Sequence, residues 1–245
     1  MPAVLVHGVP DTSAMWGPLR SHLSRDDVIA LQLPGFATPV PDGFGATKEE
    51  YADWLAGQLE AVGEPVDLVA HDWGCILAQR VASTRPELVR TLACGAGPID
   101  RTYVWHPMAQ LWQTPGSGEE VVEGMLALPA DGLAAGLTAG GAPPELAAQQ
   151  AEHLDELMGR SILALYRSAV TVGAEWEDAV AAMPPRPALV LWGRDDPYVG
   201  PEFGARLAER VHGELIVFDD CSHWWPWERA AESARALEQL WATAT

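Results

Sequence analysis

Short apolar runs alternate with helix-like amphipathic stretches near both ends of the chain. The runs predict β-strands over residues 3–6, 28–33, 66–70, 91–94, 188–192 and 215–218, and a helix over 73–83 follows the third of them directly. Continuous apolar strands of this length, separated by amphipathic helices, are typical of a parallel sheet whose two faces are both covered. The pattern therefore predicts an α/β protein.

The middle of the chain has a different pattern. Between residues 99 and 183 no strand pattern is found, and helical patterns over 118–128, 144–157 and 161–170 are separated by Gly and Pro. The run MPPRP at 183–187 then ends helix and restarts extended chain. We interpret residues 1–98 and 184–245 as one α/β core and residues 99–183 as a helical cap inserted into it.

Charge and cysteine content narrow the classes of partner. The 15 Lys and Arg residues stand against 34 Asp and Glu residues, a formal net charge of −19. We therefore expect no nucleic-acid or anionic-membrane partner, because both require a basic face. No run approaches the roughly 18 apolar residues of a membrane span, and the start MPAVLVHG lacks the basic region of a signal peptide. The three separated cysteines form no CxxC pair, so we expect a cytoplasmic protein without a disulfide framework or a metal site.

Four short polar segments follow predicted strands. They are HGVP at 7–10, AHDWGC at 70–75, WGRDDP at 192–197 and CSHW at 221–224. Each alone has an ordinary explanation, such as a turn, or a helix N-cap in the case of Asp72. Together they gather at the edge of the sheet where parallel strands end and where such sheets bind ligands. Small residues around Asp72, namely Ala70, Gly74 and Cys75, also permit the tight strand–turn–helix connection of a nucleophile elbow.

These segments carry a family resemblance. HGVP, LPGF at 33–36, HDWG, WGRDDP and SHW, together with the helical insertion, resemble the α/β-hydrolase superfamily over essentially the whole chain. The similarity is greatest to the branch with an aspartate nucleophile, the epoxide hydrolases and haloalkane dehalogenases. The family usually has two strands before the one that leads to His-Gly, and this chain begins almost on that strand. The resemblance thus implies a mostly parallel sheet of about six strands, with residues 28–33 near an edge. An apolar edge strand can pair with the same strand of a second copy, so a homodimer as well as a monomer is compatible with the sequence.

The resemblance assigns a role to each motif. It implies that Asp72 is the nucleophile, that His223 activates water, and that Asp196 orients the histidine, with the neighbouring Asp195 as the alternative. The backbone N–H groups of Val9 and Trp73 would form the oxyanion hole. A carboxylate that displaces a leaving group at saturated carbon forms an ester that water can cleave, whereas a serine would leave a stable ether. We therefore expect a small apolar electrophilic substrate and water, and no cofactor.

Epoxide opening additionally needs an acid that protonates the departing oxygen. The segment LALYR at 163–167 resembles the cap helix that carries such a tyrosine in epoxide hydrolases, which implies Tyr166. A second cap tyrosine is usual in that group. Tyr103 lies too near the preceding strand to match that position, so His106 or Trp112 is the alternative.

Release of a halide would instead use indole N–H donors. Trp73 fits the first donor position of the dehalogenases, but Val9 stands where many of them have an asparagine. Trp105 or Trp112 of the cap could replace that second donor. We expect the substrate pocket to include Tyr103, Trp105, His106, Trp112 and Trp224.

The sequence therefore predicts a cofactor-independent epoxide hydrolase that forms a covalent alkyl ester on Asp72. Two alternatives stay open. One is a haloalkane or haloacid dehalogenase that uses the same nucleophile, and the other is a non-catalytic ligand-binding relative.

Overall fold

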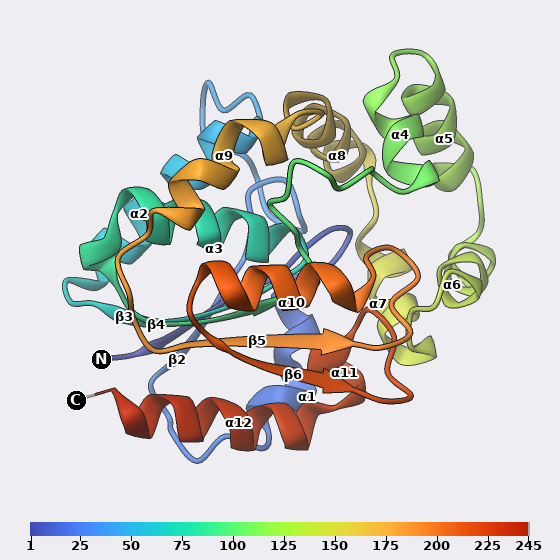
Figure 1. The fold of residues 1–245 in the computed structure, drawn as a ribbon. Helices are drawn as coiled ribbons and strands as arrows, with labels where there is room; N and C mark the ends of the chain where they lie inside the picture. The colour runs from blue at the N-terminus through green and yellow to red at the C-terminus, as the bar shows by residue number, and fades with distance from the viewer. Residues whose placement is uncertain (245) are drawn as a thin grey trace.

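A single parallel sheet forms the centre of the computed structural model, which describes residues 1–244 (Figure 1). Its strands are β1 (Ala3–Val6), β2 (Val28–Leu31), β3 (Val66–His71), β4 (Val89–Gly95), β5 (Ala188–Gly193) and β6 (Glu214–Phe218). The 6-stranded sheet has the order β2-β1-β3-β4-β5-β6, and each neighbouring pair is parallel. The predicted α/β class, the six strands and the edge position of the second strand are confirmed.

Helices cover both faces of the sheet. One layer contains α2 (Lys48–Val62), α3 (Trp73–Thr84), α9 (Val172–Ala181) and α10 (Pro201–Arg210), and the other contains α1 (Gly17–Arg20), α11 (Trp225–Glu228) and α12 (Ala230–Thr243). Strand β1 shows why apolar runs without alternation form this sheet. Val4 and Val6 pack into the hydrophobic cluster on one face, Ala3 and Leu5 pack into the cluster on the other, and all four are fully buried.

Strand and helix ends differ from the sequence prediction by a few residues, for local reasons. The second strand stops at Leu31 rather than at residue 33, because the Leu33 N–H leaves the sheet and donates to Nε2 of His7 at 3.0 Å. The helical stretch predicted over 144–157 is divided between two helices. The Asp155 side chain accepts from the Met158 N–H at 2.7 Å and so caps the start of the second one.

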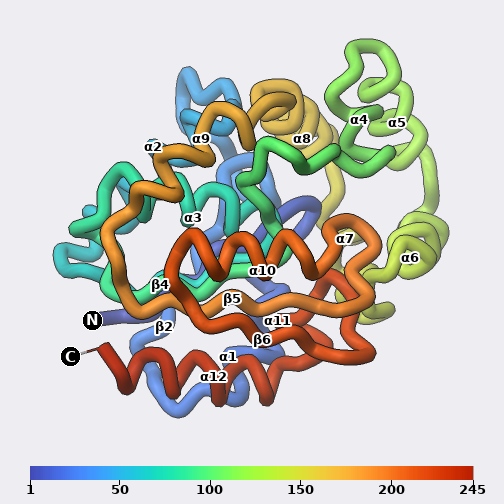
Figure 2. Tube along the Cα trace, in the orientation of Figure 1, coloured from blue at the N-terminus to red at the C-terminus, as the bar shows by residue number. Residues whose placement is uncertain are grey.

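The part of the range 99–183 that we call the cap lies over the end of the sheet where the strands finish (Figure 2). It consists of α4 (Pro107–Gln113), α5 (Ser117–Leu126), α6 (Ala130–Ala139), α7 (Pro144–His153) and α8 (Glu156–Ser168). The range 99–183 also includes α9, which packs against α3 in the core layer. There two cations lie close to the Trp176 ring, with the Arg80 guanidinium 5.0 Å and the Lys48 ammonium 5.5 Å from its centroid.

Within residues 1–244, no helix is both long enough and apolar enough to cross a bilayer. The same residues hold no group of three or more His, Cys, Asp or Glu side chains arranged to bind a metal ion. The three cysteines are buried free thiols.

Candidate active site

Asp72 occupies the turn between β3 and α3 in a strained backbone conformation, with φ 53° and ψ −122°. The space around this turn requires small neighbours. A Cβ atom on Gly74 would lie 2.3 Å from the Val6 carbonyl oxygen, and one on Gly97 would lie 2.1 Å from the Asp72 carbonyl oxygen. On the opposite side, a Cβ atom on Gly8 would lie 2.2 Å from Oδ1 of Asp72. The glycines thus let three loops converge on one carboxylate, as a nucleophile elbow requires.

His223 lies between two carboxylates. Its Nδ1 donates to Oδ2 of Asp196 at 2.8 Å, and its Nε2 lies 3.5 Å from Oδ2 of Asp72. The other oxygen of Asp196 accepts from the N–H groups of Tyr198 and Val199 at 2.8 and 3.0 Å, which fixes this carboxylate. Asp195, the alternative acid, is exposed. The structure therefore brings Asp72, His223 and Asp196 together in the order expected of a triad.

The two oxygens of Asp72 have different surroundings. Oδ1 accepts a hydrogen bond from the Val9 N–H at 2.8 Å, whereas Oδ2 faces His223. Trp73 begins α3, and the first N–H groups of a helix have no partner within it. The Val9 N–H, one of the two donors expected for an oxyanion hole, thus contacts Oδ1 and leaves Oδ2 as the oxygen that faces His223.

Burial and pairing set the charges of this group. Burial alone would raise the pKa of Asp72, but His223 and the Val9 N–H hold it below its ordinary value. Burial alone would lower the pKa of His223, yet the carboxylates of Asp196 and Asp72 raise it to about 10. The resting site is therefore an ion pair between an aspartate and an imidazolium.

Two buried histidines support the loops of the site. Nδ1–H of His7 donates to the Gly8 carbonyl at 2.8 Å while its Nε2 accepts from Leu33, which holds the loop that carries Val9. Nε2–H of His71 donates to the His223 carbonyl at 3.0 Å. Burial lowers the pKa of His7 to about 4 and that of His71 to about 3, so both are neutral.

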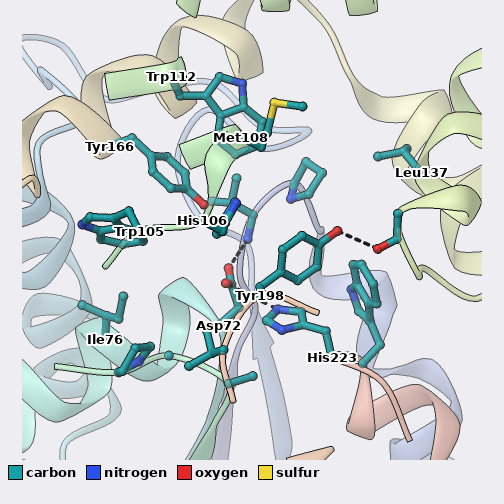
Figure 3. Close-up of a pocket in the computed structure, with 18 of the residues that line it drawn as sticks. Asp72, Ile76, Trp105, His106, Met108, Trp112, Leu137, Tyr166, Tyr198 and His223 are labelled. Atoms are coloured by element: carbon teal, nitrogen blue, oxygen red, sulfur yellow. Dashed lines mark hydrogen bonds and ion pairs between the residues drawn. The ribbon is translucent and has the colours of Figure 1, made fainter. Parts of the chain in front are cut away.

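A cavity of about 290 Å³ opens above Asp72 and His223, beneath the cap (Figure 3). Its lining includes all five residues predicted for the pocket, Tyr103, Trp105, His106, Trp112 and Trp224, and also Val9 and Tyr166. The Trp73 side chain is buried and does not reach the wall. Trp105 stacks on its indole with ring centroids 5.7 Å apart.

Tyr166, on α8, points its hydroxyl into the cavity on the side that faces Asp72 (Figure 3). Its ring packs against those of Trp112 and Trp73, with ring centroids 4.9 and 5.2 Å apart. Burial and the nearby Asp72 carboxylate raise its pKa well above the ordinary value, so the phenol keeps its proton. Tyr166 is thus a protonated donor opposite an ionised carboxylate.

The other two candidates for a second acid are placed differently. The Tyr103 hydroxyl donates to the Tyr198 carbonyl at 3.3 Å, and burial raises the pKa of this phenol. Nδ1 of His106 accepts from the Ala109 N–H at 3.3 Å and caps α4, and burial lowers the pKa of this imidazole to about 4. His106 is therefore neutral.

Comparison with known proteins agrees with this architecture. The model of the Alpha/beta hydrolase family matches residues 3–236. The chain belongs to this family. The (E)-2-((N-methylformamido)methylene)succinate hydrolase of Acinetobacter baylyi is 26% identical to it over 235 residues, which cover 91% of this chain and 83% of that protein. A 2-hydroxy-6-oxononadienedioate/2-hydroxy-6-oxononatrienedioate hydrolase of Pseudomonas putida is 25% identical over 248 residues, 93% of this chain and 82% of that protein.

Solved structures show the same fold. A haloalkane dehalogenase from Bradyrhizobium elkani superposes with a TM-score of 0.78 at 23% identity, over 99% of this chain and 91% of that one. A thermophilic esterase from Thermogutta terrifontis gives the same TM-score and identity, over 100% of this chain and 91% of that one.

The structure adds Tyr198 to the site of this α/β-hydrolase, a residue that the sequence analysis did not identify. Its ring lines the cavity and lies 5.1 Å from that of His223, and burial raises the pKa of its phenol to about 12. Its hydroxyl donates to the Gly140 carbonyl at 2.8 Å, between α6 and α7 of the cap. The only sequence signal was its position two residues after Asp196.

Two further side chains join the loops of this α/β-hydrolase site to the same part of the cap. The Ser222 hydroxyl, next to His223, lies between two acceptors, the Glu228 carboxylate and the Gly141 carbonyl, the latter at 3.2 Å. Asp11, near Val9 in the chain and 1% exposed, accepts from Nε2 of Gln150 on α7 at 2.6 Å. Asp11 also accepts from the Trp224 indole N–H at 3.2 Å, and burial raises its pKa to about 6. The loops that carry Asp196, His223 and Val9 each therefore make a polar contact with the segment 140–150.

Proposed function

We propose that this α/β-hydrolase opens epoxides to diols through a covalent alkyl ester on Asp72. The observation that carries the proposal is the pairing of two opposite groups across one apolar cavity. Asp72 is an ionised carboxylate on the floor, and Tyr166 is a buried, protonated phenol that faces it. Epoxide opening needs these two groups at once, a nucleophile for carbon and an acid for oxygen.

In the first step, Oδ2 of Asp72 attacks an epoxide carbon. A carbon–oxygen bond of the ring breaks, its electron pair stays on the epoxide oxygen, and Tyr166 supplies the proton that makes this oxygen a hydroxyl. The products are a neutral hydroxyalkyl ester and a tyrosinate.

Ester formation changes the proton affinity of His223. The pKa of about 10 depends on two neighbouring carboxylates, and alkylation removes the charge of one of them. The pKa of His223 therefore falls, and its proton can pass to the Tyr166 phenolate. The neutral imidazole is the base that the next step requires.

In the second step, His223 takes a proton from water while the hydroxide attacks the carbonyl carbon of the ester. The oxyanion forms on Oδ1, where the Val9 N–H already donates. Collapse of this intermediate expels the diol oxygen, which takes the proton from His223. The carboxylic acid of Asp72 then protonates His223 and the ion pair is restored.

Isotope labelling tests this route. In a single turnover of styrene oxide in heavy-oxygen water, the label should enter the Asp72 carboxylate and be absent from the diol, because the diol oxygen comes from Asp72. Peptide mass spectrometry locates the label. Label in the diol alone would show direct attack of water and contradict the proposal. Asp72→Asn is the control and should incorporate no label in the same turnover.

A dehalogenase is the second candidate, supported by two indole groups. The Nε1 atoms of Trp73 and Trp112 are buried and have no hydrogen-bond partner within residues 1–244. Unpaired indole N–H groups can receive a halide. Epoxide opening is favoured because the Tyr166 hydroxyl points into the cavity, whereas Trp73, which stacks on Trp105, is not among the residues that line it.

A non-catalytic binding role is disfavoured by the preserved geometry. A strained Asp72 and a histidine held between two carboxylates are features that ligand binding alone does not require. The curated relatives are named for a succinate and for dienedioates, which are dicarboxylates. Two carboxylates surround the single imidazolium at the floor of the cavity, and this negative charge argues against transferring those substrates to this chain.

A further inference from the structure

The walls of the cavity are mainly aromatic and uncharged. The Tyr166 ring meets that of Trp105 edge-on at 5.4 Å and that of Trp112 in a tilted contact at 4.9 Å between ring centroids, and all three line the cavity. Tyr198 and Trp224 form the side nearest His223. Aromatic walls of this kind pack well against a planar ring, through offset or edge-to-face contacts.

The floor of the cavity carries a net negative charge. Two carboxylates, Asp72 and Asp196, flank one imidazolium, so the triad contributes one unbalanced negative charge. Asp11 adds a third carboxylate, which accepts from the Trp224 indole N–H and interacts electrostatically with Asp72 and His223. An anionic substrate would therefore meet repulsion in a space where few water molecules screen it.

No side chain in the wall offsets this charge. None of the residues that line the cavity is Lys or Arg. His106, which could have supplied a cation, is neutral because burial lowers its pKa to about 4. The charge of an incoming carboxylate would remain unpaired.

We propose that the site selects small uncharged epoxides that carry an aryl group, and that it rejects those that carry a carboxylate. This inference rests on the proposed function, because it names the substrate class of the same Asp72 chemistry. The volume of about 290 Å³ lies near the lower end of the range for ligand pockets and fits a small ring-bearing molecule.

Two matched substrates test the charge selection. They are trans-3-phenyloxirane-2-carboxamide and trans-3-phenyloxirane-2-carboxylate, which have nearly the same shape and differ in charge at pH 8. We expect kcat/KM for the amide to exceed that for the carboxylate by about 100-fold or more. Equal values would overturn the inference while leaving the epoxide hydrolase proposal intact.

A variant that supplies the missing cation gives the reverse test. Met125 of α5 lines the cavity and is half-buried, so an arginine there can keep its stem at the wall and turn its guanidinium toward a bound carboxylate. Met125→Arg should raise the carboxylate-to-amide ratio of kcat/KM by about 10-fold or more, and Met125→Gln is the uncharged control. A ratio that rises equally in both variants would contradict the charge argument.

Binding measurements separate this inference from the proposed reaction. Phenylacetamide and phenylacetate, titrated by calorimetry, compare a neutral and an anionic ligand without any chemical step. If no epoxide alkylates Asp72 but the amide binds about 100-fold more tightly than the acid, the charge selection stands and the proposed reaction fails. If the acid binds as tightly as the amide, the inference fails whatever the turnover.

Discussion

Nε2 of His223 lies 3.5 Å from Oδ2 of Asp72, whereas its Nδ1 binds Asp196 at 2.8 Å. The shorter contact orients the imidazole ring, and the longer one connects it to the carboxylate that changes charge during the proposed reaction. This asymmetry divides the labour between Asp196, which keeps the ring in place, and Asp72, which reacts.

The division of labour predicts that His223→Gln traps the intermediate. Asp72 keeps its nucleophilic oxygen in this variant, but no base activates water for ester cleavage. Intact-mass spectrometry after mixing with styrene oxide should show one covalent adduct per chain. The exposed His22 provides the control, since His22→Gln should turn over without accumulating an adduct. An unmodified mass for His223→Gln, with a substrate that reacts with the native enzyme, would contradict the assignment.

Tyr166→Phe should slow alkylation of Asp72 by an epoxide about 100-fold or more, the usual scale for loss of a general acid. Rapid-quench measurement of adduct formation reports this step alone. The control is Tyr51→Phe, which removes another buried hydroxyl, one that donates to the Pro34 carbonyl at 2.6 Å away from the cavity. Unchanged alkylation in Tyr166→Phe would transfer the acid role to Tyr103, since His106 is neutral and carries no imidazolium proton to give.

The dehalogenase alternative makes the opposite prediction for Trp73. A halide leaves as a stable anion and needs N–H donors rather than a proton, so Trp73→Phe should reduce haloalkane turnover and leave epoxide alkylation nearly unchanged. Halide release from 1-bromobutane measures the first quantity. If epoxides fail to react and Trp73→Phe abolishes halide release, the dehalogenase assignment replaces ours.

The two chemical steps should depend differently on pH. Because the pKa of Asp72 is lowered and that of Tyr166 is raised, alkylation should be constant between about pH 5 and 9. Ester cleavage needs neutral His223, whose pKa of about 10 falls once Asp72 is an ester. The rate of ester cleavage in single-turnover experiments should therefore rise with pH, and the midpoint of this rise should lie below pH 10. A rate of cleavage that does not change over this range would contradict the role of His223.

Asp11 should make the fold less stable at high pH. Burial raises its pKa from 3.8 to about 6, so the folded state binds more protons than the unfolded state in that window, and the free energy of unfolding falls as pH rises through it. Asp11→Asn removes this dependence. Its free energy of unfolding relative to the native protein should be about 2 kcal/mol higher at pH 8 than at pH 4.5, at 1.36 kcal/mol per pKa unit.

Urea denaturation at the two pH values measures this difference. Loss of one acceptor for Gln150 or Trp224 is the same at both values and cancels in the comparison. If the free energy of unfolding of Asp11→Asn differed from that of the native protein by the same amount at both pH values, Asp11 would titrate normally.

The fold was predictable because its strands are apolar on both faces, as β1 illustrates, and because the residues that follow them are small or polar. Ends of elements depended on contacts distant in sequence. The end of β2 is set by His7, twenty-six positions before Leu33, and no local pattern encodes that bond. The triad motifs were visible because each directly follows a strand.

The remaining parts of the site depend on packing between segments. Tyr198 reaches the cavity because its N–H binds Asp196 and its ring turns toward His223, which only the folded loop shows. Trp73, which the dehalogenase alternative would place beside a halide, is fully buried, and its indole stacks on that of Trp105. The chain has 11 tryptophans, so sequence alone could not say which of them form the wall and which lie behind it.

The polar contacts that join Tyr198, Ser222 and Asp11 to the segment 140–150 have a consequence for protein engineering. Exchanging this part of the cap to admit a new substrate would also remove the partners of the loops that carry the acid, the histidine and the oxyanion donor. Specificity and turnover would then change together. A graft that keeps the backbone carbonyls at positions 140 and 141 and an amide side chain at position 150 would let specificity change without a change in turnover. Directed evolution could then vary the entrance of the cavity while the chemistry is retained.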